Sequence, residues 1–212
     1  MPQGVLSFAE LVEVSFRKIA YEVVSEGRRL ADALSEPLTA VVLGSGVEKI
    51  AESLKQYGAD TILVGDDPAL ADYTTDLYTS VLAGVARQRD PRLFLLGAST
   101  RGKDLAARLA ARLNTGLAME CVALELQEGT LVATRPIFGG KVVARVALKG
   151  TPQMAAVRPN VMDIVETHTE GTVERLAVDG GEAKTKVVDK KAEGGAKLEL
   201  TEADIVGSGG RG

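Results

Sequence analysis

The chain has 212 residues, a formal net charge of −4, 4% aromatic residues and no tryptophan. This length suits one α/β domain of ordinary size plus a smaller piece. The slightly acidic balance and the few aromatic side chains argue against nucleic-acid binding by phosphate neutralisation or base stacking. The single cysteine, Cys121, excludes an internal disulfide, and the chain shows neither a secretory signal nor an apolar run that could span a bilayer. We therefore expect a cytoplasmic protein of bacterial or archaeal type that does not insert into membranes.

Short apolar runs alternate with amphipathic helical patterns through the first half of the chain. Strands are predicted at residues 5–9, 38–43, 61–64 and 93–96, and helices at about 15–34, 47–54, 74–89 and 100–113. This alternation is typical of right-handed βαβ units, so we predict an α/β fold with a doubly wound, mostly parallel sheet. Gly27 lies on the apolar face of the first long helix, which indicates a close approach of that helix to the sheet.

The pattern changes after residue 113. Strand-like runs follow one another without helices at residues 117–126, 131–137, 142–148 and 154–157. They predict an antiparallel β segment, a meander added to the sheet edge.

We place an N-terminal α/β domain at residues 1–162. Residues 163–202 are polar and predict an extended connector with one or two edge strands, the first at 173–178. Residues 203–212 contain a new strand and a glycine-rich turn, as expected for the start of a truncated C-terminal domain.

The loop after the fourth strand resembles a phosphate loop in its spacing. Residues 97–104 fit that spacing except at the last position, where Asp104 replaces the Ser or Thr that binds magnesium. The alternative is an ordinary turn, with Ser99 or Thr100 capping the following helix and Asp104 near its positive dipole end. We favour the turn, with Arg101 and Lys103 exposed on it.

The residues form no credible catalytic set. His168 is the only histidine and has no nucleophile in an elbow motif, and no His/Cys cluster has metal-ligand spacing. Asp66 and Asp67 with Asp60 could coordinate magnesium, but two acids beside a proline are more typical of a turn. Cys121 is most simply a buried apolar residue. We predict neither a catalytic nor a metal site, so the chain is a scaffold or subunit and not an enzyme.

Four stretches resemble the α (large) subunit of electron-transfer flavoproteins. They lie in the family's order and span the chain, at residues 5–10, 96–113, 135–141 with 157–161, and 208–212. The resemblance implies a fold like that of adenine-nucleotide α-hydrolases. It also implies an αβ heterodimer that carries electrons from flavin dehydrogenases, such as the acyl-CoA dehydrogenases of fatty acid β-oxidation, to a quinone oxidoreductase. In such proteins FAD is held mainly by the α subunit's C-terminal domain. The N-terminal domain binds no nucleotide and packs with the β subunit into a base.

The terminal Gly-Gly-Arg-Gly motif matches a place where the family contacts its flavin. By this resemblance Gly209, Gly210 and Arg211 are cofactor-binding residues, since a guanidinium suits a pyrophosphate and glycines let the backbone approach it. Most of the family's FAD contacts lie beyond Gly212, so we predict that this polypeptide alone binds no FAD. Two alternatives are an ATP- or AMP-binding domain that uses residues 44–46 or the loop at Gly97, and an interaction module with no electron role. Independently of these alternatives, Ser45 is a candidate cap for the helix predicted at about residues 47–54.

Overall fold

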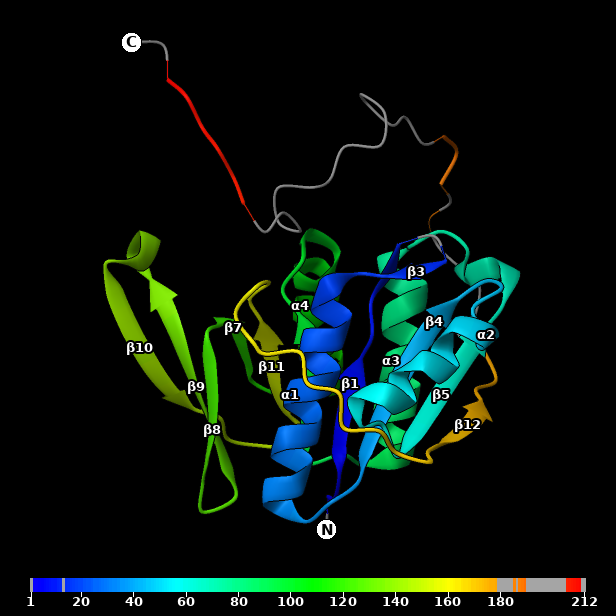
Figure 1. The fold of residues 1–212 in the computed structure, drawn as a ribbon, viewed down its shortest axis with the longest axis horizontal. Helices are drawn as coiled ribbons and strands as arrows, with labels where there is room; N and C mark the ends of the chain where they lie inside the picture. Colours follow the sequence, from blue (N-terminus) through cyan, green and yellow to red (C-terminus); the bar gives the residue numbers. More distant parts are fainter. Residues whose placement is uncertain (1, 13, 179–184, 186, 190–204, 211–212) are drawn as a thin grey trace.

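The computed structural model describes residues 2–12, 14–178, 185, 187–189 and 205–210. Its centre is a seven-stranded sheet in the order β12-β5-β4-β1-β6-β11-β7, with every neighbouring pair parallel (Figure 1). The strands are β1 (Val5–Phe8), β4 (Leu38–Gly44), β5 (Thr61–Asp66), β6 (Leu93–Gly97), β7 (Leu117–Cys121), β11 (Gln153–Val157) and β12 (Thr172–Arg175).

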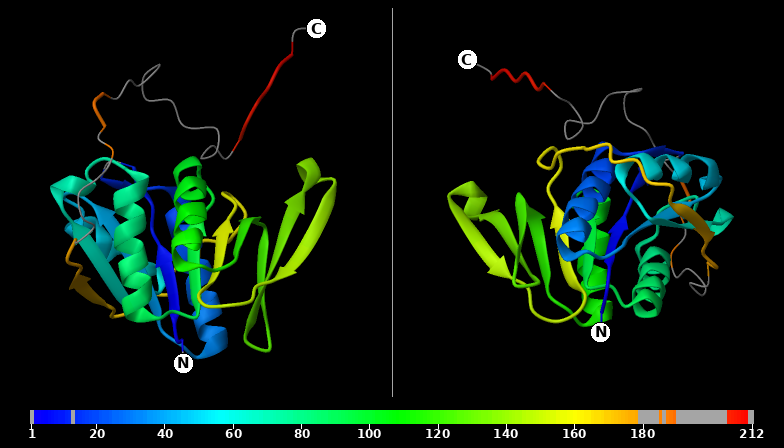
Figure 2. Two further views of the ribbon diagram at one scale, coloured as in Figure 1. Left: turned by 180° about the vertical axis from the view of Figure 1, so that it is seen from behind. Right: turned by 60° about the horizontal axis from the view of Figure 1, so that its bottom comes forward.

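Helices cover both faces of this sheet. One face packs on α1 (Lys18–Leu34) and on α2 (Glu48–Ala51), which continues as the 3₁₀ helix η1 (Glu52–Tyr57). The other face packs on α3 (Thr75–Arg89) and α4 (Thr100–Leu113), seen from behind in Figure 2, and the 3₁₀ helix η2 (Pro68–Leu70) follows β5. Because both faces are covered, all five residues of β6 are buried. The predicted doubly wound parallel fold is confirmed.

The antiparallel segment forms a separate sheet beside the β7 edge. It contains β8 (Ala123–Gln127), β9 (Thr130–Ile137) and β10 (Val142–Ala147), with the 3₁₀ turn η3 (Phe138–Gly140) between the last two. The prediction that residues 117–126 form one strand of the meander is wrong, because residues 117–121 form β7 of the parallel sheet. The chain turns into β8 after Glu120, which has a left-handed φ of 60°.

The prediction that residues 154–157 belong to the antiparallel meander is wrong. They lie in β11, which is inserted in parallel between β6 and β7. Met154, Ala155, Ala156 and Val157 are each 0% exposed, as in a strand covered on both faces. The first long helix also begins later than predicted, since β2 (Leu11–Val12) pairs with β3 (Ser15–Phe16) in antiparallel fashion before α1 begins.

Gly27 brings α1 against the sheet as predicted. A Cβ atom at this position would overlap Ser7 Oγ on β1 and lie 2.9 Å from Leu38 Cδ1 on β4. A larger residue would push the helix away from the strands.

Residues 158–171 form a strap that crosses α1 from β11 to the far edge of the sheet (Figure 1). The buried Glu22 carboxylate of α1 accepts hydrogen bonds from the backbone N–H groups of Asn160 (3.0 Å), Val161 (3.2 Å) and Met162 (3.3 Å). The strap then leads into β12, which pairs in parallel with β5. A strand therefore lies near the predicted edge position, while the division into domains at residue 162 stays a prediction.

Candidate functional site

The carboxyl ends of β1 and β6 mark the place where a doubly wound sheet usually binds a nucleotide. The chain winds outward through β4 and β5 on one side of β1, and through β6 on the other. Such a switch point leaves a crevice between the loops that follow the two central strands. Here these loops begin with Ala9-Glu10 and with Ala98-Ser99.

Side chains of the protein itself fill this crevice. Glu10 is 5% exposed, and its carboxylate pairs with Arg17 Nη1 at 3.3 Å and accepts a hydrogen bond from the Ser99 hydroxyl. Ser99 Oγ in turn accepts the backbone N–H of Gly102 at 2.9 Å, which caps α4. The prediction that Ser99 caps this helix is confirmed, but Asp104 lies beyond the helix's first turn and not at its positive dipole end as predicted. A Cβ at Gly102 would overlap the Gly97 carbonyl oxygen, so this loop is folded tightly on itself.

The space between Glu10 and the tyrosines on the α3 side is too small for a nucleotide. The cavity between Glu10, Tyr73, Tyr78 and Arg101 measures about 20 Å³. That is room for about one water molecule, whereas small-molecule sites measure roughly 300–1,000 Å³.

Tyrosine hydroxyls close the crevice on the α3 side. Tyr73 donates a hydrogen bond to Asp104 at 2.8 Å, and Thr75 donates to the same carboxylate. Tyr78 donates to the Leu70 carbonyl at 2.9 Å. Burial raises the pKa of Tyr73, and it raises the pKa of Tyr78 to about 12, so both phenols stay protonated donors at neutral pH. These hydroxyl groups therefore hydrogen-bond within the protein and do not form an acid–base pair.

The two cations of the loop have different surroundings. The Arg101 guanidinium lies 5.9 Å from the Tyr73 ring centroid. Arg101 is half-buried, so the prediction that it is exposed is wrong. Lys103 is exposed as predicted and forms an ion pair with Glu120, which also lies 3.6 Å from Arg158 Nε. Lys103, Glu120 and Arg158 line a hollow of about 300 Å³ at the Ala98–Ser99 loop. The Glu120 carboxylate reduces its positive charge.

The second candidate nucleotide loop, residues 44–46, is occupied by a carboxylate. Asp66, at the end of β5, accepts the backbone N–H groups of Gly46 (2.7 Å), Val47 (2.9 Å) and Glu48 (3.1 Å). Burial alone would raise the pKa of Asp66, but these three donors and Arg175 outweigh it and lower the pKa. A phosphate at this loop would need the same N–H groups.

The prediction that Ser45 caps this helix is wrong, because Val47 is the N-cap residue and its side chain makes no cap bond. Asp66 takes the capping role from a strand 20 residues away. Only the pairing of Gly44 with Asp66 in the sheet register brings the two segments together.

The three acids considered for magnesium serve other contacts. Asp60 lies at the start of β5 and binds Arg28 (2.7 Å) and the Leu38 N–H (2.8 Å). Asp66 lies at the strand's opposite end. Asp67 caps η2, since its Oδ1 accepts the backbone N–H of Ala69 at 2.8 Å. Among the residues that the structure describes, no group of three His, Cys, Asp or Glu side chains could hold a metal ion.

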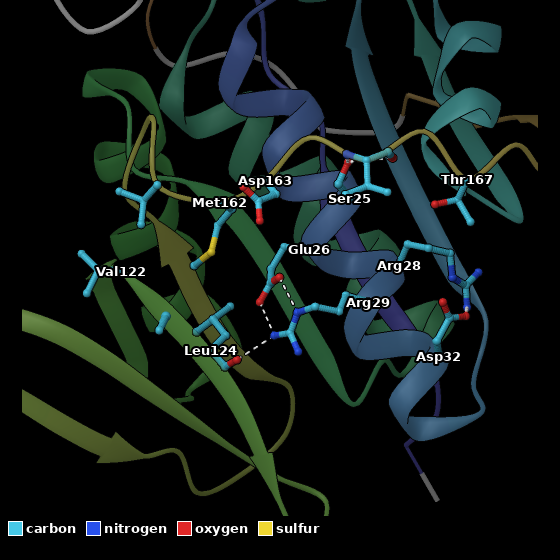
Figure 3. A pocket seen from close by; sticks show the side chains of 13 residues that line it. Ser25, Glu26, Arg28, Arg29, Asp32, Val122, Leu124, Met162, Asp163 and Thr167 are labelled. Atoms are coloured by element: carbon cyan, nitrogen blue, oxygen red, sulfur yellow. Dashed lines mark hydrogen bonds and ion pairs between the residues drawn. The ribbon is translucent and has the colours of Figure 1, made fainter. Parts of the chain in front are cut away.

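An open groove of about 420 Å³ runs between α1, the start of β8 and the strap (Figure 3). Arg29 crosses it, with Nε 2.7 Å and Nη2 2.5 Å from the two oxygens of Glu26, and donates to the Leu124 carbonyl at 2.6 Å. The hydrogen bond to Glu26 raises the pKa of Arg29. Arg28 and Asp32 pair at 2.7 Å on the same helix. The hydrogen bond from Arg29 to the Leu124 carbonyl therefore connects α1 to the antiparallel sheet.

Comparison with known proteins identifies the family. The model of the electron transfer flavoprotein domain matches residues 5–186. The chain belongs to the electron transfer flavoprotein family. It is 43% identical to "Protein FixB" of Clostridium saccharobutylicum, over 99% of this chain and 64% of that protein. It is 38% identical to the electron transfer flavoprotein subunit alpha of Thermoanaerobacterium thermosaccharolyticum, over 97% of this chain and 64% of that protein. An "Acryloyl-CoA reductase electron transfer subunit beta" of Anaerotignum propionicum is 34% identical, with 97% and 64% covered.

The chain spans a little under two thirds of the length of these electron transfer flavoprotein relatives. The resemblance to the α subunit is therefore confirmed at the level of the family and its α-type subunits. In the described part of the chain, no helix is both long enough and apolar enough to cross a bilayer.

The flavin-binding motif of the electron transfer flavoprotein resemblance lies at the edge of the described residues. Gly209 and Gly210 are exposed, and a Cβ at either would meet no atom within 4 Å. Arg211 lies outside the described residues. The described residues therefore do not assemble a flavin site around this motif, and its role stays a prediction.

Two further reactive side chains are the thiol of Cys121 and the imidazole of His168. Cys121 is buried, its Sγ lies 3.3 Å from the Ala118 carbonyl, and burial raises the pKa of its thiol to about 12. A thiol in this state is not a nucleophile at neutral pH. His168 is exposed on the strap, 3.5 Å from Glu166.

Proposed function

We propose that this chain is the N-terminal scaffold part of an α-type electron-transfer flavoprotein subunit, a carrier and not an enzyme. The observation that carries the proposal is the filled crevice: the architecture of a nucleotide-binding fold is present, but Glu10, Arg17 and Ser99 occupy the ligand position. A subunit that binds no nucleotide in this domain can use the carboxyl edge of its sheet for contacts with other domains.

In the complete protein we expect FAD to supply the redox chemistry. The Gly-Gly-Arg-Gly motif would contribute Arg211, Gly209 and Gly210 to its site, and a β subunit would pair with this domain. We further propose that electrons come from flavin dehydrogenases that act on acyl-CoA substrates, as in fatty acid β-oxidation, and pass to a quinone oxidoreductase. The relative that is named for acryloyl-CoA reductase supports a partner enzyme that acts on CoA thioesters.

The alternative, an ATP- or AMP-binding domain of the adenine-nucleotide α-hydrolase type, is opposed at both candidate loops. The cavity beside Glu10 and Arg101 has room for about one water molecule, and the larger hollow at the Ala98–Ser99 loop contains the Glu120 carboxylate. The Asp66 carboxylate occupies the N–H groups of the loop at residues 44–46.

Two measurements test the proposal. Calorimetry with AMP, ATP and FAD should show no binding to the 212-residue chain. The complete subunit, co-expressed with its β subunit, should purify as a heterodimer with a flavin spectrum that bleaches when a dehydrogenase and its substrate are added. Stoichiometric AMP binding to the chain, or a complete subunit that purifies with no flavin and no partner, would contradict the proposal.

A further inference from the structure

The outer strand of the antiparallel sheet, β10, has an open edge. Among the described residues it pairs only with β9, and Figure 1 shows the β9–β10 hairpin reaching away from the body. Leu148 N–H donates to the Leu131 carbonyl of β9 at 3.0 Å. The N–H and C=O groups of successive residues point to alternate sides of a strand, so Val142, Ala144 and Val146 also direct their N–H and C=O groups toward β9. Val143, Arg145 and Ala147 therefore present their N–H and C=O groups to the open edge.

The side chains of β10 differ on the two faces of the sheet. Val142, Ala144 and Val146 share a face with Ile137, Arg135 and Ala133 of β9, and Leu131 lies farther along the same face. Leu131 and Ala133 are both 0% exposed against the body, whereas Val142 is 47% and Val146 38% exposed. The apolar face therefore extends beyond the part that the body covers.

The other face is mixed, with charged side chains among apolar ones. It carries Arg145, which pairs with Glu125 at 2.6 Å, between Val143 and Ala147. Lys141 and Lys149 flank the strand, are exposed, and form no ion pair with any described residue. An added strand would meet apolar side chains on one face and the charged Arg145 on the other.

We propose that the open edge of β10 docks an extended segment of the β subunit, which adds a fourth strand to this sheet. The inference rests on the proposed function for the identity of the partner. The segment has apolar side chains on the Val142–Val146 face and acidic side chains on the Arg145 face, because these complement what β10 presents. Pairing with a second copy is disfavoured, since antiparallel β10 strands would place both Arg145 side chains close together on one face.

Val143→Pro in the complete subunit tests the docking edge. The substitution removes an N–H that points to the open edge, and it leaves every β9–β10 hydrogen bond in place. Val143→Ala is the matched control, because it shortens the side chain and keeps the N–H. We expect Val143→Pro to weaken β-subunit binding about tenfold or more in a titration, and Val143→Ala to change it less than about threefold.

The double variant Val142→Thr/Val146→Thr provides a second test that keeps strand-forming residues. It makes the overhanging face polar, and we expect binding to weaken about fivefold or more. Circular dichroism and the melting temperature of each free variant report whether it folds.

The outcomes separate the two proposals. Wild-type binding that persists unchanged in folded Val143→Pro and in the double variant overturns the docking edge and leaves the proposed function standing. A wild-type subunit that forms no complex with the β subunit overturns both. A homodimer in sedimentation that Val143→Pro dissociates overturns the choice of partner, because a second copy is then the occupant.

Discussion

Replacing Gly27 by alanine tests the closest contact between α1 and the sheet. The added Cβ would lie 2.9 Å from Leu38 Cδ1 and would overlap Ser7 Oγ. Ser7 and Leu38 are each 0% exposed, so neither side chain can move without displacing its neighbours. We expect this variant to be less stable than the wild type.

The magnitude follows from two opposing terms. Alanine gains about 0.8–1 kcal/mol of helix propensity over glycine. Overpacking in a well-packed core costs about 1–3 kcal/mol. Gly84→Ala in α3 isolates the first term, because Gly84 is exposed and its Cβ would meet no atom within 4 Å. Gly84→Ala should therefore be stabilising, and the two variants should differ by about 1–3 kcal/mol.

Urea unfolding followed by circular dichroism measures both variants. In a chain of this length each kcal/mol corresponds to about 2–4 °C in melting temperature, so the difference is readily resolved. Equal stabilisation by the two alanines would refute the reasoning, since it would mean that α1 does not touch the sheet at Gly27.

Three further predictions concern carboxylates and the thiol. Glu22→Ala should lower the free energy of unfolding by about 2 kcal/mol, because three backbone N–H groups of the strap lose a buried acceptor. The control, Glu52→Ala at an exposed position on η1, should change the free energy of unfolding by less than about 0.5 kcal/mol. Equal effects of the two substitutions in urea unfolding would contradict the role of Glu22. Folding lowers the pKa of Asp66, so the carboxylate contributes stability above its unfolded pKa of about 3.9 that is lost as the pH falls through the lower folded pKa. Asp66→Asn should flatten this acid branch of the stability profile, and an unchanged branch would show that Asp66 does not cap α2. Cys121, whose pKa is raised to about 12, should resist iodoacetamide at pH 8 in the folded chain and react in urea, and rapid alkylation without urea would contradict its burial.

Patterns that are local in the chain were enough to predict the architecture. Alternating apolar strands and amphipathic helices require a parallel sheet covered on both faces, because each element has one apolar face to bury. The Ser99 cap and the close contact at Gly27 also follow from short-range chemistry: a hydroxyl just before a helix, and a glycine on a buried helix face. The resemblance to electron-transfer flavoproteins likewise rested on short stretches read in order.

The order of the strands and the filling of the crevice depend on tertiary structure. Residues 153–157 have the same apolar character in a meander or in a central strand, and only the crossover that inserts β11 between β6 and β7 distinguishes them. Glu10 meets Ser99 across 89 residues, and Asp66 meets Gly46 across 20. Each carboxylate reaches its partners because parallel strands end together at one edge of the sheet, which no local pattern records. The sequence alone therefore determined a nucleotide-binding architecture, and the tertiary contacts decided that its own side chains occupy the ligand positions.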